Sequence, residues 1–332
     1  MNEKATIFIE GLEHKRFIEP YITALEDELE IEILSFEDIK FDNYTTTILE
    51  KNDFNEYLLN LKSSIFITTT PGIGNAYFPK SKTFPKVDRP KYIYVFHSLV
   101  SPNEVYSKNS FSGFDIIFSP NSIISEQLEF LVSSKTKIFS TGYPLISNNY
   151  YFQNKVSENK NVLIAPSWGK NSLFKVVDIE LLIRNLQSQN FNITLRPHPM
   201  ELDLIENFVN FSEINIDQNK DLNNLAHYDY LISDWSGIAI EFSILTNKKT
   251  IYIETPKKIR RKIKKSEKHI KLIENEIRSS AGIVLTNINQ INFSNLFDNE
   301  NLFNVEDKSY LNNLILPKFE DSKIIKLIRE NI

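Results

Sequence analysis

Two short segments of this sequence carry the residue types that bind anions. Residues 196–199 read Arg-Pro-His-Pro after an apolar run, and residues 233–237 read Ser-Asp-Trp-Ser-Gly after another. An apolar, helix-spaced segment follows the second one directly. A strand that turns at once into a helix presents unpaired backbone N–H groups and the positive end of the helix dipole to whatever lies above it. The two segments together predict a site for a phosphate-bearing ligand.

Each segment offers specific donors for that ligand. Prolines on both sides of His198 restrict the backbone, so the imidazole can donate to a phosphate oxygen, and Arg196 can fork onto the same group. The Ser236 hydroxyl and the Gly237 amide are the expected donors of the second segment. The alternatives are a histidine that fills a turn, an arginine in a surface ion pair, and an Asp234 that only caps the next helix. Asp234 is otherwise expected to bind a ligand hydroxyl or to orient a neighbouring side chain.

His97 follows the apolar run 92–96 and is a candidate general base. A histidine at a strand end has a pKa near neutrality and faces the edge where ligands bind, although it also suits a structural hydrogen bond to a loop carbonyl. His14, His227 and His269 have no comparable setting. The histidines lack metal-ligand spacing and the chain has no Asp-x-Asp, so we expect no metal site and no cofactor.

Strand and helix patterns alternate along the chain, which is typical of parallel sheets with crossover helices. The pattern predicts an α/β protein with two doubly wound, Rossmann-like domains that face a central cleft. We expect an acceptor-side domain over residues 1–150, a nucleotide-donor domain over 151–315, and a final helix within 316–332 that packs back on the first domain. The polar stretch 147–160 is the expected linker.

Composition excludes several classes of function. The chain has 332 residues, no cysteine, a formal net charge of −5 and no apolar run long enough to cross a membrane. These features argue against disulfides and general nucleic-acid binding, and they fit a cytoplasmic protein.

The segment Lys257–Lys271 is an exception to the acidic composition. It holds nine Lys or Arg against one Glu, with isoleucines at roughly helical spacing. A solvated helix face is one reading. A basic amphipathic helix, which would suit peripheral contact with an anionic membrane or a polyanionic acceptor, is the other.

These motifs resemble the CDP-glycerol glycerophosphotransferase family, the teichoic-acid and capsule polymerases. The resemblance covers about residues 90–256 and is carried by residues 95–98, 114–119, 141–144, 196–199, 233–237 and 241–242. It implies a GT-B fold, a donor nucleotide in the second domain and no required metal. It also implies that His97 is the catalytic base, that His198 binds the donor pyrophosphate and that Ser236 and Gly237 form the phosphate turn.

Other donor contacts are expected from Ser167, Asp234, Glu241 and Pro199, with Glu241 placed where nucleotide-sugar enzymes hold the ribose. The chain departs from the family pattern at two places. Ser98 and Leu99 follow His97 where the family has Gly-Thr, and Gly237 stands where it has a second serine. These departures bear on the group that is transferred.

The sequence therefore predicts a metal-independent transferase. It would move a glycerol-phosphate-like or sugar group from a nucleotide-activated donor, with a cytidine-linked donor favoured, to a glycan or polyol-phosphate acceptor of the cell envelope. The alternatives are a CMP- or UDP-sugar-dependent glycosyltransferase, a nucleotide-sugar epimerase, and a catalytically silent GT-B scaffold subunit.

Overall fold

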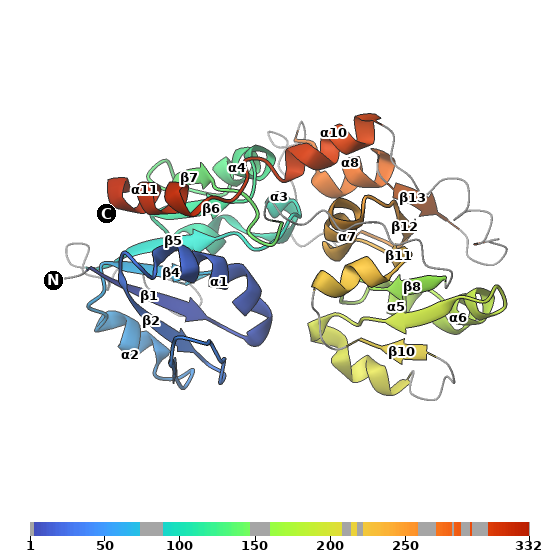
Figure 1. Ribbon diagram of the computed structural model, residues 1–332, viewed down its shortest axis with the longest axis horizontal. Coiled ribbons are helices and arrows are strands. Elements are labelled where there is room, and N and C mark those ends of the chain that lie inside the picture. Colours follow the sequence, from blue (N-terminus) through green and yellow to red (C-terminus); the bar gives the residue numbers. More distant parts are fainter. Residues whose placement is uncertain are drawn as a thin grey trace. The chain divides into compact units, whose positions relative to one another are not determined.

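The computed structural model describes residues 3–73, 89–146, 160–207, 214–217, 222–257, 270–280, 282–286, 293 and 305–331. These residues fall into two compact units, each built around its own parallel sheet (Figure 1). The predicted linker falls almost wholly outside the described residues, as does the basic segment between Lys257 and Ile270.

The first unit contains a seven-stranded parallel sheet. Its strands, in spatial order, are β3 (Thr46–Ile48), β2 (Glu30–Ser35), β1 (Lys4–Ile9), β4 (Ile65–Thr68), β5 (Lys91–Val95), β6 (Ile116–Ser119) and β7 (Lys137–Ser140). The chain winds to one side of β1 through β2 and β3, and to the other side through β4 to β7. The strand order therefore reverses between β1 and β4, and ligands of doubly wound sheets bind outside the carboxyl ends of the strands at such a point.

Helices cover the first sheet and complete its core. They are α1 (Leu12–Leu25), α2 (Phe54–Leu59), α3 (Pro102–Val105), the 3₁₀ helix η2 (Lys108–Phe111), α4 (Ser122–Glu129) and α11 (Asp321–Asn331). The C-terminal helix α11, red in Figure 1, packs on α1 through Ile324 and Ile328, which lie one turn apart and are buried.

Gly142 adapts the first unit to the segment that leads into α11. Its φ of +94° belongs to the left-handed region, and a Cβ atom there would lie 2.3 Å from the backbone nitrogen of Phe319. Only glycine combines this conformation with so close an approach. The Thr-Gly-Tyr-Pro segment at residues 141–144 thus has a packing role in the first unit.

The second unit contains a six-stranded parallel sheet. Its strands, in spatial order, are β10 (Ile214–Ile216), β9 (Asn192–Leu195), β8 (Asn161–Ile164), β11 (Tyr230–Ser233), β12 (Thr250–Ile253) and β13 (Gly282–Leu285). The order reverses between β8 and β11. Both predicted anion-binding segments and the loop after β8 consequently lie at the edge where a ligand is expected.

The helices of the second unit follow the same logic. They are α5 (Leu173–Val176), α6 (Ile179–Gln187), the 3₁₀ helices η3 (Pro199–Asn207) and η4 (Leu222–His227), α7 (Ile238–Thr246), α8 (Ile273–Ser280) and α10 (Val305–Leu314). In α6, the Asp178 side chain accepts from the Leu181 amide at the start, and one apolar stripe is buried against the sheet.

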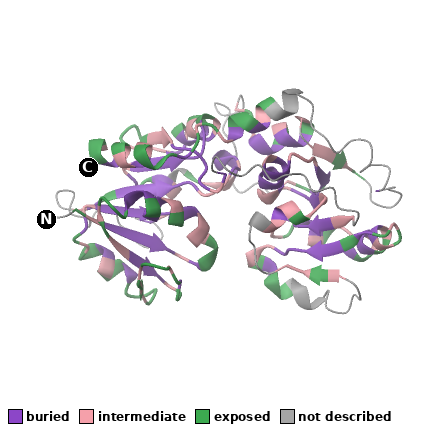
Figure 2. Ribbon diagram, in the orientation of Figure 1, coloured by how far each residue is buried: buried purple, intermediate pink, exposed green. Residues whose placement is uncertain are grey.

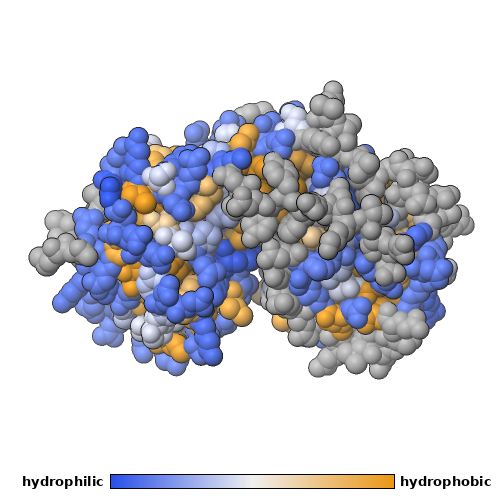
Figure 3. Space-filling view, viewed as in Figure 1, coloured by the Kyte–Doolittle hydropathy of each residue, from blue (hydrophilic) through white to orange (hydrophobic). Residues whose placement is uncertain are grey.

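The pattern of burial follows the sheets. Figure 2 shows the strands of both sheets largely as buried, whereas α1 and α11 each show an exposed face. The face drawn in Figure 3 is mostly hydrophilic, with apolar residues scattered over it. Within the described ranges, no helix is both long and apolar enough to cross a bilayer.

The expected elements differ from the structure in three places. The sequence pattern of residues 48–61 predicts one helix, but α2 spans only Phe54–Leu59, because Ile48 belongs to edge strand β3 and pairs with Ser35. The pattern of residues 17–29 predicts another helix, whereas α1 begins at Leu12 and ends at Leu25. The stretch after residue 272, which shows no clear pattern in the sequence, contains α8 and β13.

Candidate functional site

At the reversal point of the second sheet, Asp234 joins the turn after β11 to the loop after β8. Its Oδ1 accepts from the Ser167 amide at 2.7 Å, and its Oδ2 accepts from the Ser167 hydroxyl and the Leu173 amide, both at 2.9 Å. The carboxylate is fully buried, and that burial raises its pKa against the opposing effect of these hydrogen bonds. Of the two roles considered for Asp234, the structure places it where it orients a neighbour, Ser167.

The phosphate turn continues from Asp234 into α7. Gly237 is the N-cap residue of this helix and has helical dihedral angles. Ser236 and Gly237 are both half-buried, and within the described part of the chain the Ser236 hydroxyl donates no hydrogen bond. The amides of Ala239 and Ile240 already donate to the carbonyls of Ser236 and Gly237. The Ser236 hydroxyl and the amides of Gly237 and Ile238 are therefore the donors that this turn offers to an anion. Glu241, on the same helix, is 6% exposed, so its side chain lies within the fold.

His198 is held in one orientation after β9, at the sheet edge where the turn after β11 also lies. Its Nδ1 accepts from the Met200 amide at 3.1 Å, and the Trp168 ring lies against it with 5.8 Å between centroids. Because Nδ1 is an acceptor, the neutral ring carries its proton on Nε2, where it is a donor. Pro199, the next residue, is half-buried and begins η3.

Arg196 lies at the end of β9 but is directed to a neighbouring strand end. Its Nε and Nη2 donate to Oδ2 of Asp217 at 3.0 and 2.5 Å, and the guanidinium is only 5% exposed. The ion pair that the sequence analysis considers as an alternative role for Arg196 is therefore present, but it is buried and not at the surface. In this conformation Arg196 braces the ends of β9 and β10, with two of its nitrogens engaged by Asp217.

Arg278, on α8, supports the turn that follows β11, a role that the sequence does not predict. Its Nη1 donates to the Asp234 carbonyl at 2.9 Å, and its Nη2 lies 2.5 Å from Oε2 of Glu254. The guanidinium stacks on Trp235, 3.9 Å from the ring centroid, and on Tyr252 at 4.7 Å. A signal was available in the sequence. Ile273 and Ile277 are spaced i, i+4 and mark the buried face of α8, and Arg278 directly follows Ile277.

A second carboxylate fixes the loop after β8. Buried Glu201 accepts from the Gly169 amide at 2.8 Å and from the Ser172 hydroxyl at 3.1 Å, and it pairs with Lys175 at 2.8 Å. Gly169 has a φ of +96°, which glycine adopts without strain. The loop that contains Ser167 and Trp168 is thus anchored at both ends.

In the first unit, the polar residues at the reversal point follow the ends of β1, β4 and β5. His97 lies after β5, half-buried, with Nδ1 3.3 Å from the Tyr94 hydroxyl. Burial, helped by the nearby His14 and Arg16, lowers the pKa of His97 to about 3, against a hydrogen bond to the Thr69 backbone that raises it. The imidazole is therefore uncharged at neutral pH, the form that accepts a proton.

His14 is the residue of this site that the sequence reasoning set aside. It lies on the first turn of α1, its Nδ1 is 2.6 Å from the Thr69 hydroxyl, and its ring centroid is 4.9 Å from that of His97. Burial lowers its pKa. The available signal was its place, because a residue just after β1 lies at the reversal point once the strand order is known.

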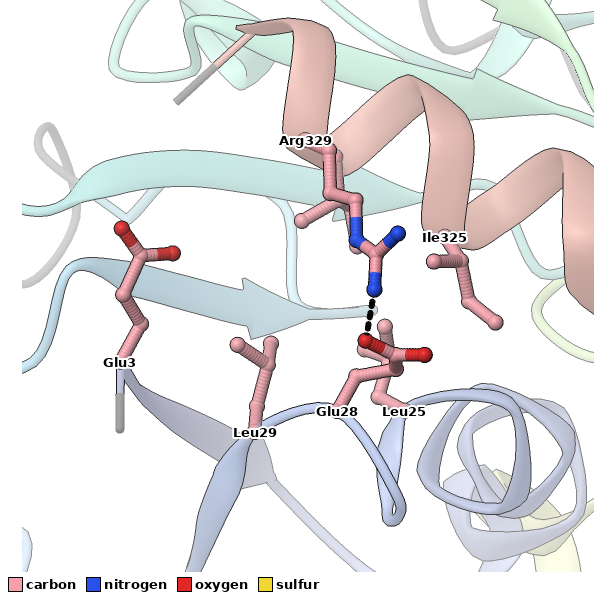
Figure 4. A pocket seen from close by; sticks show the side chains of 7 residues that line it. Glu3, Leu25, Glu28, Leu29, Ile325 and Arg329 are labelled. Carbon is pink, nitrogen blue, oxygen red and sulfur yellow. Dashed lines mark hydrogen bonds and ion pairs between the residues drawn. The ribbon is translucent and has the colours of Figure 1, made fainter. Parts of the chain in front are cut away.

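No group of three or more His, Cys, Asp or Glu side chains within the described ranges has the arrangement of a metal site. The expectation of a metal-independent protein stays a prediction. A surface recess of about 270 Å³ lies near Glu3, which precedes β1, and so away from the carboxyl ends of the first sheet's strands (Figure 4). Leu25, Leu29 and Ile325 line it with the Glu28–Arg329 ion pair, so it is mainly a gap in the packing of α11 on α1.

Comparison with known proteins identifies a family that covers most of the chain. The family model described as CDP-glycerol:poly(glycerophosphate) glycerophosphotransferase matches residues 16–258. No curated protein matches the sequence.

Solved structures with less than 20% sequence identity share the fold. A His→Asn variant of the wall teichoic acid polymerase TagF, soaked with CDPG, has a TM-score of 0.62 at 16% identity over 100% of this chain and 88% of that one. The Staphylococcus aureus MnaA–UDP co-structure has 0.61 at 14% over 100% and 98%, and a UDP-N-acetylglucosamine 2-epimerase from Rickettsia bellii has 0.58 at 11% over 99% and 97%. The two doubly wound units are therefore those of a GT-B fold.

Proposed function

This chain belongs to the CDP-glycerol:poly(glycerophosphate) glycerophosphotransferase family, and from that premise we propose which transfer it performs. It moves a glycerol-phosphate-like group from a cytidine-linked, nucleotide-activated donor to a teichoic-acid-like or polysaccharide acceptor of the cell envelope. The observation that carries the proposal is the pair of strand ends at the reversal point of the second sheet. There a fixed turn with available amides and a fixed imidazole N–H lie at one edge.

Donor phosphates would bind to Ser236, to the Gly237 amide and to Nε2–H of His198. These donors are preorganised: Asp234 and Arg278 hold the turn, and the Met200 amide holds the imidazole. Fixed donors stabilise charge that develops on a departing phosphate without paying for reorganisation during the reaction. Arg196 would contact the phosphate only if its guanidinium left Asp217, because the carboxylate neutralises its charge in the present pair.

The remaining donor contacts are proposed at the same edge. Ser167 would contact the donor from the loop that Asp234 holds, while Asp234 itself acts through Ser167. Pro199 would line the path beside His198, and Glu241 would hold the ribose after a shift that opens its buried side chain. The reaction as proposed uses no metal and no cofactor.

His97 would act as the general base in the transfer. The acceptor hydroxyl oxygen attacks the phosphorus that carries the glycerol, and its proton passes to the neutral imidazole. A new P–O bond to the acceptor forms as the bond to the nucleotide's phosphate oxygen breaks, and CMP leaves with that electron pair. The pKa of His97, about 3 and not the near-neutral value expected from the sequence, keeps the ring unprotonated before the reaction but makes it a weaker base than an ordinary imidazole.

Calorimetry on the purified protein with CDP-glycerol, CMP and UDP tests the donor proposal. We expect binding of CDP-glycerol that is weakened about tenfold or more in His198→Asn, since a charge-assisted hydrogen bond contributes about 1.5–3 kcal/mol. His227→Asn, at an exposed histidine of the same unit, is the matched control and should bind as the wild type does.

The other outcomes of this titration select among the alternatives. A preference for UDP would indicate a glycosyltransferase or epimerase that uses uridine-linked sugars. No binding of any nucleotide would contradict the donor site and favour a silent scaffold subunit. The proposed setting is the cytoplasm, and contact of the segment Lys257–Lys271 with a membrane is a separate proposal that vesicle sedimentation would test.

A further inference from the structure

Two imidazole rings lie together at the reversal point of the first sheet. The ring centroids of His14 and His97 are 4.9 Å apart, and Phe17 packs against His97 at 5.6 Å. Thr69 connects the two histidines, because its hydroxyl is 2.6 Å from Nδ1 of His14 and its backbone forms a hydrogen bond with His97. The rings are therefore held close by a buried residue at the end of β4.

The charged groups around the two rings differ in sign. Three carboxylates raise the proton affinity of His14: Glu13, whose Oε1 is 3.9 Å from Nε2, and the more distant Glu10 and Glu37. Arg16 opposes them. Among the described residues, no carboxylate acts on His97 in this way. The charged groups that affect it are Arg16 and His14, and its polar neighbour is the un-ionised Tyr94.

A proton added to this pair consequently favours His14, and a second proton on His97 is opposed by the first. We propose that His14 and His97 work as one unit: the pair accepts a single proton, the proton resides on His14, and His14 thereby keeps His97 in its uncharged, proton-accepting form. This rests on the proposed function of His97 as the base. His14 is then a positioning residue that acts through His97.

The His14–His97 pair would keep the base uncharged in a reaction that has an anionic donor. A diphosphate near an imidazole favours the charged ring, which would remove the base before the acceptor arrives. A proton drawn into the pair by the diphosphate goes to His14 first, because the carboxylates lie around that ring, and its charge there counters the effect on His97. After each transfer, the proton that His97 takes from the acceptor hydroxyl returns to solvent, and the pair again holds at most one.

The pair can be tested without any substrate by following the imidazole resonances in ¹³C-histidine protein from about pH 2 to pH 8, a range that includes the low pKa of His97. His14 should protonate first, and His97 should stay neutral until the pH approaches 3. In His14→Gln the midpoint of His97 should rise by about 0.6 units or more, the repulsion of two charges at this separation even in bulk water. His227→Gln should leave it unchanged.

An unchanged His97 midpoint in His14→Gln would overturn the proposal, because it would show that the rings titrate independently. If His14→Gln does not fold, His14→Asn takes its place. It also removes the ring that can carry the charge, and the midpoint of His97 should again rise. An unshifted midpoint in that variant would also contradict the pair.

The pH dependence of kcat/KM separates this proposal from the proposed function. In His14→Gln the acidic limb of the profile should move to higher pH with the His97 midpoint, while His227→Gln keeps the wild-type profile. If the titration shows a coupled pair but no nucleotide donor is turned over, the proposed function fails and the pair stands. If turnover occurs with an unshifted limb, the pair fails and the proposed function stands.

Discussion

The two reversal points of this chain use the same topology for opposite purposes. In the first unit, the strand ends bring together two titratable rings, His14 and His97, which pack against each other. In the second unit, Asp234 is committed to three hydrogen bonds from the loop after β8, and the turn that follows it is fixed. A proton acceptor has to change its charge state, whereas donors to an anion are most effective when nothing moves.

Burial also acts with opposite sign at the two points. It lowers the pKa of His97, a base, and raises the pKa of Asp234, an acid, because in both cases the charged form is penalised. His97 therefore contributes stability that is lost as the pH falls toward its folded pKa. Asp234 contributes stability at low pH that is lost as the pH rises through its folded pKa.

The largest effect on stability is expected from Asp234→Ala. The substitution leaves the amides of Ser167 and Leu173 without their acceptor in a buried place, and each unsatisfied group costs about 1–3 kcal/mol. We expect a loss of about 3 kcal/mol or more in the free energy of unfolding, measured by urea denaturation. Asp234→Asn keeps one acceptor oxygen and should lose less. Equal stability of Asp234→Ala and the wild type would contradict the view that this carboxylate holds the loop.

A smaller effect is expected from Arg278→Lys. Lysine keeps the charge but cannot reach the Asp234 carbonyl and Glu254 together while stacking on Trp235. The loss should be about 2 kcal/mol, the range of hydrogen bonds to charged groups.

Arg184→Lys is the matched control for that substitution. It alters an exposed i, i+4 pair with Glu180, which should contribute less than about 0.5 kcal/mol. If both variants unfold at the same urea concentration as the wild type, Arg278 is not a support of the phosphate turn. Tryptophan fluorescence would follow the change locally, because one of the two tryptophans is Trp235.

The smallest effect is a pH dependence. Below pH 6.5 the unfolded chain takes up about one proton at residue 97 that the folded protein refuses until near pH 3. The stability of the wild type relative to His97→Asn should therefore decrease as the pH is lowered from 7 to 5. Parallel pH profiles of the two proteins would show that this ring is not protected from protonation in the folded state.

The sequence predicts the sheets better than the contacts at their ends. Parallel alternation and the buried runs locate most strands, and the Ser-Asp-Trp-Ser-Gly turn and His97 lie at strand ends as expected. Edge strand β3 was missed because its sequence, Thr46–Ile48, is short, half-exposed and lacks an apolar run. Edge strand β13 is apolar, and it was missed because the sequence around it shows no strand–helix alternation. His14 was missed because only the strand order, β2-β1-β4, brings the end of β1 beside the residues that follow β4 and β5.

Long-range partners were also beyond local reasoning. Nothing near Arg196 in the sequence reveals that Asp217 engages it, and Arg278 lies 44 residues after the carbonyl that it binds. The sequence is compatible with an Asp234 that binds a ligand hydroxyl and with one that orients a neighbouring side chain. The choice depends on Ser167, which lies 67 residues before it. Spacing predicts which residues face the sheet edge, but not which of them already have a protein partner.

The most direct test of the contrast compares His97→Asn with His198→Asn in two assays, equilibrium binding of CDP-glycerol and release of CMP in the presence of acceptor. We expect His97→Asn to bind the donor as the wild type does and to lose about 10²–10⁴ of the rate, the usual contribution of a general base. His198→Asn should bind the donor about tenfold or more weakly. Loss of donor binding in His97→Asn, with normal binding and turnover in His198→Asn, would contradict the assignment of the two sites.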